Sequence, residues 1–426
     1  MPCLYAADKR YARTGASSEL IMLTFNPEKI RNDFPILTYS DSPLVYLDSA
    51  ASAQKPCVVI DRLDTLYRRE YSSVHRGVHR LSEHATAQFE ASRVSIQKFL
   101  NAQYAHEIIF VRGTTEAINL VASSYGRTQC RAGDELIISA MEHHSNIVPW
   151  QILCQQTGAL LKIIPVDTQG QLQIDVYKNL LSPRTKLVAL THVSNVLGTI
   201  NPIKQIIALA HQNNTPVLID GAQGIVHTQV DVQDLDCDFY AFSGHKLFGP
   251  SGIGVLYGKQ NLLEAMPPYQ TGGGMITTVN LEQSQYRELP YRFEAGTPSI
   301  AGAIGLATAI DYLNQIDRAA AHCHEQMLLH MLTDNLLNIP KLHLIGTAEK
   351  KASILSFVLD DVHAHDIGTI LAASDIAVRV GHHCCMPLMQ QFHVPATVRA
   401  SLAFYNNQQD IEALITALHT VRTIFK

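Results

Sequence analysis

The stretch DFYAFSGHKLFG, residues 238–249, is an apolar run that ends in a short polar turn containing Lys246. The run is apolar on both faces, which is typical of a buried strand in a parallel sheet covered on both sides. Ligands of such sheets bind beyond the carboxyl ends of the strands. A lysine in this aromatic, glycine-flanked turn is expected to be partly desolvated. Desolvation lowers the pKa of its amine and suits it to Schiff-base formation.

The same theme repeats along the chain from about residue 107. Each short apolar run is followed by a polar or glycine turn and then by a stretch with helical periodicity, which is the βαβ pattern. The repeat predicts an α/β fold with a mainly parallel sheet. We expect its strands at residues 107–111, 135–139, 160–166, 186–191, 216–219, 238–242 and 253–257.

The pattern changes after Pro298. A helical stretch is expected from Ala301 to about Leu337, followed by strands near 342–345 and 352–359 and then by more helix, which predicts a smaller α/β domain. The expected organisation is a disordered extension (1–20), an N-terminal segment packing with the small domain (21–34), a large cofactor-binding domain (35–298) and a small C-terminal domain carrying a cysteine loop (299–426).

Composition excludes several classes of function. The 33 Lys and Arg against 38 Asp and Glu give a net charge of -5, so no polybasic surface for nucleic acid is expected. No apolar run approaches the roughly 18 residues of a membrane helix. Eight cysteines without a CxxC pair favour a reducing, cytoplasmic location. Residues 1–20 lack the apolar core of a secretory signal, while organelle targeting by them stays open.

Asp220 follows the expected strand 216–219, so its carboxylate and Lys246 are expected at the same edge of the sheet. Taken alone, an aspartate at this place is explained about equally well as a helix cap. Together with the lysine, it fits the group that keeps a pyridinium nitrogen protonated. The pair therefore predicts pyridoxal phosphate as the cofactor.

Two further strand ends carry groups suited to this cofactor. The strand 107–111 runs into Thr114 and Thr115, whose hydroxyls and backbone N–H groups at a helix start predict a phosphate site. The strand 135–139 is followed by His143, an imidazole that can stack on an aromatic ring. The simpler alternatives are an ordinary threonine cap and a loop histidine.

These motifs, in chain order, resemble the class V aminotransferase superfamily of fold-type I pyridoxal-phosphate enzymes. The resemblance spans roughly residues 25–425 and is strongest to its group II cysteine desulfurases of the SufS type. It rests on YLDSAASAQKP (46–56), VHRGVH (74–79), RGTTE (112–116), MEHHSN (141–146), THVSN (191–195), DGAQ (220–223), SGHK (243–246) and RFEAGTP (292–298).

The resemblance implies a role for each matching residue. Lys246, Cys384 and His143 are implied to be catalytic, and Asn195 and Arg399 to hold the substrate carboxylate, with Arg379 counted among the substrate-binding residues. No metal is implied. The resemblance also implies that Lys246 holds the cofactor as a Schiff base and that Asp220 pairs with the pyridine nitrogen. It implies that His143 stacks on the ring and that Gln223 bonds the phenolic oxygen. The phosphate is implied to be bound by Thr114, Thr115, Ser243 and His245, together with Thr297 from the second subunit of a homodimer.

The segment Val380–Pro387, VGHHCCMP, decides the reaction, because pyridoxal phosphate alone permits several. A zinc site is disfavoured, since four consecutive residues cannot readily face one tetrahedral centre. A vicinal disulfide would be strained. A catalytic thiolate fits better, because Arg379 or a protonated histidine can lower the pKa of a neighbouring thiol. The family pattern selects Cys384.

Two positions depart from the family pattern. Cys385 stands where a small residue is usual, and its role as a sulfur acceptor, an oxidation decoy or a bystander stays open. The loop 271–275, TGGGM, lacks the usual polar residue between the glycines and the methionine, so the loop that reaches the partner's site is expected to differ.

The resemblance implies conversion of L-cysteine to L-alanine, with a persulfide on Cys384 passed to a SufE-like acceptor for iron–sulfur cluster assembly. The seven residues 376–382 are expected to form a short loop, so the acceptor must come to the cysteine. The alternatives are a selenocysteine lyase, a thiol-independent aminotransferase or kynureninase-like enzyme and, least favoured, a non-catalytic sulfur-relay scaffold.

Overall fold

The computed structural model describes residues 26–38 and 44–425. Its largest element is a seven-stranded sheet in the order β2-β8-β7-β6-β5-β3-β4. The strands β7, β6, β5, β3 and β4 run parallel, and β8 is antiparallel to both of its neighbours. The predicted α/β fold is confirmed. The strands are β2 (Ile108–Val111), β3 (Glu135–Ser139), β4 (Leu160–Ile164), β5 (Thr185–Thr191), β6 (Val217–Asp220), β7 (Phe239–Ser243) and β8 (Gly254–Gly258).

The observed strands differ from the predicted ones by no more than two residues at either end. The largest difference is in β4, which ends at Ile164 instead of continuing to Val166. Pro165 follows Ile164, and proline has no N–H group to donate to a neighbouring strand.

Both faces of this sheet are buried. In β6, Val217 and Ile219 belong to one buried cluster while Leu218 belongs to another on the opposite face. Helices α4, α9 and α13 contribute to the first cluster, and α5, α7 and α12 to the second. The helices are α3 (Cys57–Thr65), α4 (Arg80–Leu100), α5 (Thr114–Val121), α6 (Arg127–Gln129), α7 (Val148–Thr157), α8 (Ile174–Leu180), α9 (Ile203–Gln212), α10 (Gly224–His227), α11 (Val232–Leu235), α12 (Gln260–Ala265) and α13 (Ile300–Leu313).

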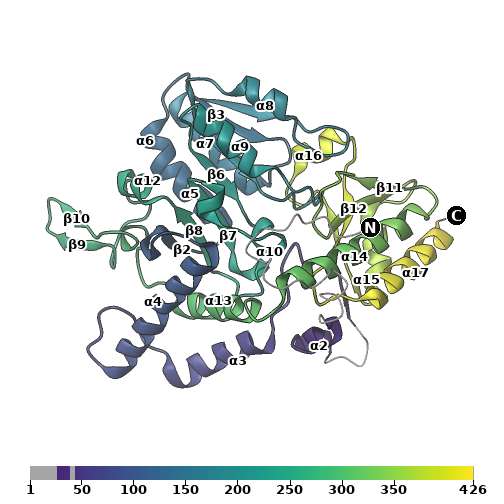
Figure 1. The fold of residues 1–426 in the computed structure, drawn as a ribbon, viewed down its shortest axis with the longest axis horizontal. Coiled ribbons are helices and arrows are strands. Elements are labelled where there is room, and N and C mark those ends of the chain that lie inside the picture. The colour runs from purple at the N-terminus through teal and green to yellow at the C-terminus, as the bar shows by residue number, and fades with distance from the viewer. Residues whose placement is uncertain (1–25, 39–43, 426) are drawn as a thin grey trace, which may run out of the picture.

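A second, four-stranded antiparallel sheet has the order β11-β12-β15-β14 and a buried cluster of its own. In Figure 1 it lies at the right with its helices, and the hairpin of β9 (Ile276–Val279) and β10 (Ser284–Tyr286) projects at the left. Its elements are β11 (Leu342–Ile345), β12 (Ile354–Leu359), β14 (Arg379–Gly381), β15 (Thr397–Ser401), α14 (Arg318–Leu337), α15 (Ala364–Ala372), α16 (Met386–Gln391) and α17 (Gln408–Ile424).

The N-terminal part of the described chain packs beside this second sheet. Arg31 of α2 (Pro27–Arg31) donates to the Asp410 carboxylate of α17 at 3.0 Å. Strand β1 (Val45–Tyr46) pairs in parallel with β13 (Ile376–Ala377). Residues 45–46 therefore lie with the C-terminal unit, although the predicted large domain, 35–298, includes them. The expectation for residues 1–20 lies outside the described residues.

The single helical stretch predicted after Pro298 is wrong. Helix α13 ends at Leu313 and α14 begins at Arg318, because the Asp317 carboxylate caps the new helix by accepting the N–H groups of Ala319 and Ala320. Moreover, α13 packs in the core of the large sheet.

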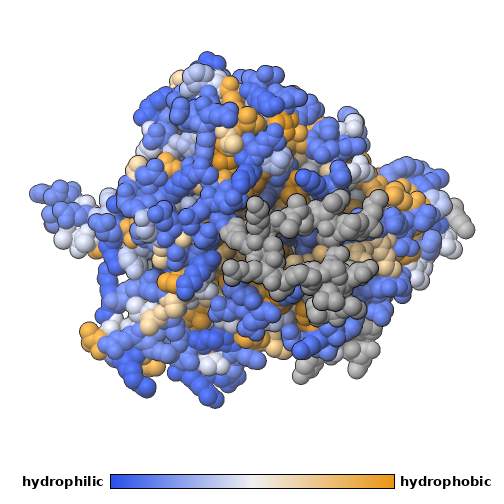
Figure 2. Space-filling view, viewed as in Figure 1, coloured by the Kyte–Doolittle hydropathy of each residue, from blue (hydrophilic) through white to orange (hydrophobic). Residues whose placement is uncertain are grey.

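Hydrophilic residues cover most of the described surface on the face drawn in Figure 2. Among the helices of residues 26–38 and 44–425, none is both long enough and apolar enough to cross a membrane.

Arg93 of α4 is a charged side chain in the interior, only 2% exposed. Its two terminal nitrogens donate to the Glu294 carboxylate at 2.7 and 2.9 Å, and one also donates to the Ile108 carbonyl at 2.8 Å. The same carboxylate accepts the N–H of Phe110, over whose ring the guanidinium lies. The pair therefore joins α4, β2 and the loop that leads to Thr297.

We expect Arg93→Ala to lower the free energy of unfolding by about 3–5 kcal/mol, because Glu294 would become a buried charge without its partner. Urea unfolding of the purified protein measures the change. The matched control is Arg68→Ala, which removes an exposed pair with Asp64 and should leave the free energy of unfolding nearly unchanged, because water screens exposed ion pairs. Equal losses in the two variants would contradict the assignment.

Candidate active site

Lys246 lies in a single 3-10 turn, Gly244–Lys246, directly after β7. Strand β6 pairs in parallel with β7 and ends at Asp220, so the Lys246 amine and the Asp220 carboxylate lie at the same edge of the sheet. Burial lowers the pKa of the Lys246 amine, the Asp220 charge opposes this effect, and the Arg399 charge adds to it. The structure thus brings together the lysine and the carboxylate that the sequence placed at two separate strand ends.

Asp220 is 4% exposed, and its Oδ1 accepts the N–H of Ala222 at 2.9 Å. Burial raises the pKa of this carboxyl group, while the Ala222 N–H and Lys246 act in the opposite direction. The next residue, Gly221, cannot carry a side chain, because a Cβ there would lie 2.0 Å from the Tyr240 ring. Glycine at this position therefore lets the chain after Asp220 pack directly against the Tyr240 ring.

Two of the predicted phosphate-binding residues, Thr114 and Ser243, are in direct contact. The N–H of Thr114 donates to Ser243 Oγ at 2.9 Å, and the two hydroxyl groups are 2.8 Å apart. Thr115, at the exposed start of α5, contacts Ser145 Oγ at 2.7 Å. Ser145 in turn lies 3.0 Å from His143 Nδ1, which links the two loops. Sequence reasoning missed Ser145, although it lies inside the quoted MEHHSN motif.

The loop that carries His143 is anchored by Glu142, which is fully buried. The Glu142 carboxylate accepts hydrogen bonds from the Thr191 N–H at 3.1 Å, from the Asn146 amide at 2.7 Å and from the Ser139 hydroxyl. Burial raises the pKa of this carboxyl group to about 8. Glu142 was also missed, because its motif neighbour His143 offered the more obvious chemistry.

His143 and His245 are both neutral at neutral pH. Burial, with the nearby Lys246 charge, lowers the pKa of each imidazole to about 4. The His245 carbonyl accepts the N–H of Ala53 at 3.1 Å and the Lys55 amine at 3.0 Å. Lys55 was missed although it belongs to the quoted YLDSAASAQKP string.

Gln223 and Thr297 have different surroundings. Gln223 is buried, and its side-chain amide donates to the Ala50 carbonyl at 2.6 Å. Thr297 is exposed on the loop after Glu294. The role expected for Thr297 concerns a second subunit, so it stays a prediction.

The predicted carboxylate-binding residues come from the second sheet and from a loop of the large unit. Arg399 of β15 is 2% exposed and donates to the Asn195 carbonyl at 3.0 Å and to Asp48 Oδ1 at 2.9 Å. Arg379 of β14 also donates to Asp48, at 3.0 Å. Asp48 thus bridges both arginines, and sequence reasoning did not single it out.

Cys384 is exposed, whereas Cys385 is fully buried. The Cys385 thiol donates to Asn195 Oδ1 at 3.2 Å, and burial raises its pKa well above the usual value. Because a reactive cysteine needs both access and a thiolate, Cys384 is the candidate nucleophile of the two.

The turn that carries Cys384 has an unusual backbone. His383 and Cys384 have φ values of +51° and +56°, and non-glycine residues in this region cost about 1–3 kcal/mol each. The expected loop 376–382 is mostly short strand, because β13 pairs with β1 and β14 pairs with β15. Cys384 therefore follows closely after β14, the edge strand of the second sheet.

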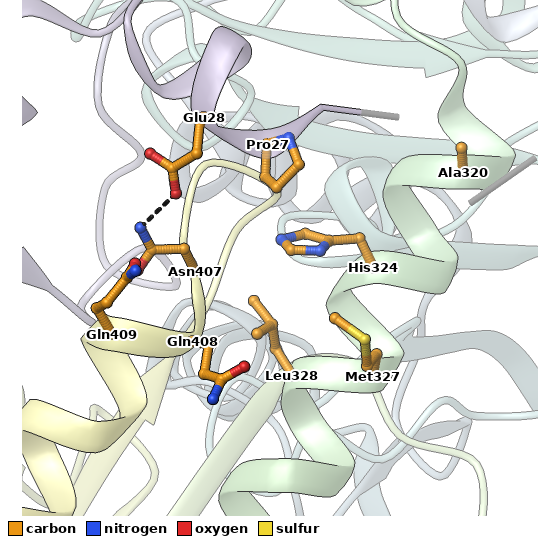
Figure 3. A pocket seen from close by; sticks show the side chains of 9 residues that line it. All are labelled: Pro27, Glu28, Ala320, His324, Met327, Leu328, Asn407, Gln408 and Gln409. Carbon is orange, nitrogen blue, oxygen red and sulfur yellow. Dashed lines mark hydrogen bonds between the residues drawn. The ribbon is translucent and has the colours of Figure 1, made fainter. Parts of the chain in front are cut away.

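These residues fit pyridoxal phosphate in the chemistry of their donor set. A partly desolvated amine, a buried carboxylate and two neutral imidazoles lie beside hydroxyl groups at a helix start. A separate cavity of about 320 Å³ lies elsewhere, between α2, α14 and the start of α17 (Figure 3). None of the predicted site residues lines it.

Comparisons with known proteins found relatives of this chain in both sequence and structure. A curated cysteine desulfurase from Cronobacter sakazakii is 52% identical over 399 residues, covering 93% of this chain and 98% of the relative. The crystal structure of the cysteine desulfurase CsdA from Escherichia coli matches with a TM-score of 0.89 and 41% identity, covering 94% of this chain and all of that one. A cysteine desulfurase structure from Thermococcus onnurineus NA1 matches with a TM-score of 0.89 and 36% identity, covering 93% of this chain and 98% of that one.

Residues 45–414 match the family described as Aminotransferase class-V. That match spans well over half of the chain, and the relatives are aligned over almost their full length. The family resemblance drawn from the sequence motifs is confirmed, and this chain belongs to the class V aminotransferase family.

Proposed function

We propose that this chain is a pyridoxal-phosphate-dependent cysteine desulfurase that converts L-cysteine to L-alanine and takes the sulfur onto Cys384. One observation carries the proposal: a single residue, Asn195, joins the cysteine turn to the arginine that would hold the substrate. Its side-chain amide donates to the His383 carbonyl at 2.9 Å, and its own carbonyl accepts from Arg399. The names of the relatives agree with this activity.

Each cofactor contact would come from residues already described. Lys246 would hold the cofactor, Asp220 its pyridine nitrogen, His143 its ring face, and Ser243 and Thr115 its phosphate. Bound pyridoxal phosphate supplies an electron sink for charge that develops at the substrate Cα. Because burial lowers the pKa of the Lys246 amine, this group is suited to accept the Cα proton and to return it later.

The substrate carboxylate would bind at Arg399. Within the described part of the chain, its Nε is a buried donor without a hydrogen-bond partner, although the two terminal nitrogens are occupied. A buried donor without a partner is costly, and a bound carboxylate would satisfy it. Asp48 would keep the guanidinium oriented while the substrate binds.

In the sulfur transfer, Cys384 Sγ attacks the substrate sulfur. A sulfur–sulfur bond forms as the Cβ–S bond breaks, and the electron pair stays with the three-carbon skeleton, which is protonated and leaves as alanine. The exposure of Cys384 supports delivery of the sulfur to a protein that docks on this face. We propose a SufE-like acceptor and iron–sulfur cluster assembly as the destination.

A homodimer is part of the same proposal. Large apolar side chains lie exposed on the projecting hairpin and on the segment before α4: Leu281 is fully exposed, Val78 is 95% exposed and Val279 is 61% exposed. A second copy covering these residues would remove them from water. It would also bring a second Thr297 near a partner's site, as the family resemblance implies.

We expect Cys384→Ser to reduce alanine and sulfide formation from L-cysteine to the background rate, because a serine hydroxyl cannot take sulfur. The cofactor absorbance should be unchanged, since Lys246 and Asp220 stay in place. Steady-state assays and intact-mass analysis of the persulfide measure the effect.

Cys57→Ser is the matched control, because Cys57 is also exposed and free but lies on α3. It should keep full activity. Normal alanine formation by Cys384→Ser would contradict the proposed reaction and favour a thiol-independent enzyme of the same family.

We expect Arg399→Lys to lower kcat/KM for L-cysteine by about ten- to a hundredfold, mainly through a higher KM, because an ammonium group cannot offer a donor at the position of Nε while also bonding Asn195 and Asp48 as the two terminal nitrogens do. Initial rates over a range of cysteine concentrations separate the two constants. Arg127→Lys, an exposed change of the same type, should leave both constants as they are. An unchanged KM in Arg399→Lys would remove Arg399 from the carboxylate site.

A further inference from the structure

The turn His382–Met386 requires support from outside itself. Two consecutive non-glycine residues, His383 and Cys384, have left-handed backbone conformations. Such conformations persist only where the surrounding structure fixes them. Within the turn, the Cys385 N–H donates to the His382 carbonyl at 2.8 Å and the Cys384 N–H donates to the His382 ring at 3.1 Å. The Cys384 carbonyl and the Met386 N–H have no partner within the turn, so their hydrogen bonds must come from residues outside it.

His144 bonds both of those backbone groups. Its N–H donates to the Cys384 carbonyl at 2.7 Å, and its Nε2 accepts the Met386 N–H at 3.1 Å. One residue of the large unit therefore holds the nucleophile's own peptide group and the start of α16. His144 directly follows His143, so the loop that contributes the ring-stacking imidazole also fixes the cysteine.

We propose that His144 is a positioning residue for the Cys384 nucleophile. Its neutral imidazole and backbone N–H hold the strained turn so that the thiol stays where the substrate sulfur arrives. The proposal rests on the proposed function and deepens it, because His144 was assigned no role by the sequence motifs. It acts through the turn and is not required to touch the substrate.

The imidazole must be neutral to act in this way. Nε2 can accept the Met386 N–H only when the ring proton is on Nδ1. Once Nε2 is protonated it becomes a donor, and it then faces the Met386 N–H, which is also a donor, so the hydrogen bond is lost. Its titratable neighbours are the rings of His382 and His143, at centroid distances of 5.6 and 6.3 Å. Burial and the His382 charge lower the pKa of His144, so the bond is present at neutral pH and is lost as the pH falls through that pKa.

The experiment compares His144→Ala and His144→Gln in the cofactor-loaded enzyme. His144→Ala should lower kcat for alanine formation by about three- to tenfold while KM for L-cysteine changes by less than about twofold, because the Arg399 site is untouched. His144→Gln, whose side-chain oxygen can accept the Met386 N–H, should restore most of kcat. Its activity should also fall less steeply toward acid pH than that of the wild type.

Hydrogen exchange of the peptide covering 382–388 in the resting enzyme supplies a readout independent of turnover. The Met386 amide should exchange several-fold faster in His144→Ala than in the wild type or His144→Gln. The control is His343→Ala, which removes an exposed histidine of β11 that pairs with Asp360. It should change neither the exchange of the Met386 amide nor kcat.

The outcomes separate this proposal from the proposed function. Wild-type kcat and wild-type exchange in His144→Ala would overturn the positioning role. A loss of kcat in His144→Gln equal to that in His144→Ala would also overturn it, since acceptor chemistry would then be irrelevant. Suppose that the Met386 amide exchanges faster in His144→Ala, but that the wild type forms no persulfide on Cys384. The role of His144 in holding the turn would then stand, and the proposed desulfurase reaction would be rejected.

Discussion

The buried carboxylate of Asp220 and the amine of Lys246 lie at one edge of the large sheet, and their mutual electrostatic effect sets the character of the site. Burial raises the pKa of the carboxyl group and lowers that of the amine, and each charge partly offsets the cost of the other. The two groups meet because β6 and β7 run parallel and end at the same edge of the sheet. The two apolar clusters that cover the sheet hold that register and also remove the water that would restore ordinary pKa values.

The other half of the site is built where the second sheet meets the large one. Arg379 and Arg399 stand on adjacent antiparallel strands in register with each other, and Asp48 lies between their guanidinium groups. Asp48 follows β1, which pairs with β13 in a separate two-stranded sheet, and Asp48 itself forms an isolated bridge with Ser401 of β15, so the N-terminal part of the described chain packs against the C-terminal unit. The residues proposed to bind the substrate and to take its sulfur therefore lie at the junction between units distant in sequence.

Prediction from the sequence succeeded where a local pattern has one dominant physical cause. The strands of the large sheet were placed within two residues because runs apolar on both faces need burial on both sides. Prediction failed at the helix after Pro298, where the Asp317 cap starts a new helix within a long helical pattern. It also failed for the expected loop 376–382, which is mostly strand because β1 and β15, distant in sequence, supply its hydrogen-bond partners.

Residue types and their spacing were enough to predict the parallel sheet and the lysine and aspartate at its edge, and the resemblance of the quoted motifs indicated the family. Which cysteine is accessible, the bridging of two arginines by Asp48 and the bonding of the cysteine turn by His144 became visible only in the folded chain. Cys384 and Cys385 are adjacent and identical in type, and only the packing around them leaves one exposed and the other buried against Asn195. Contacts of this kind depend on distances between residues far apart in the chain, which spacing along the sequence does not encode.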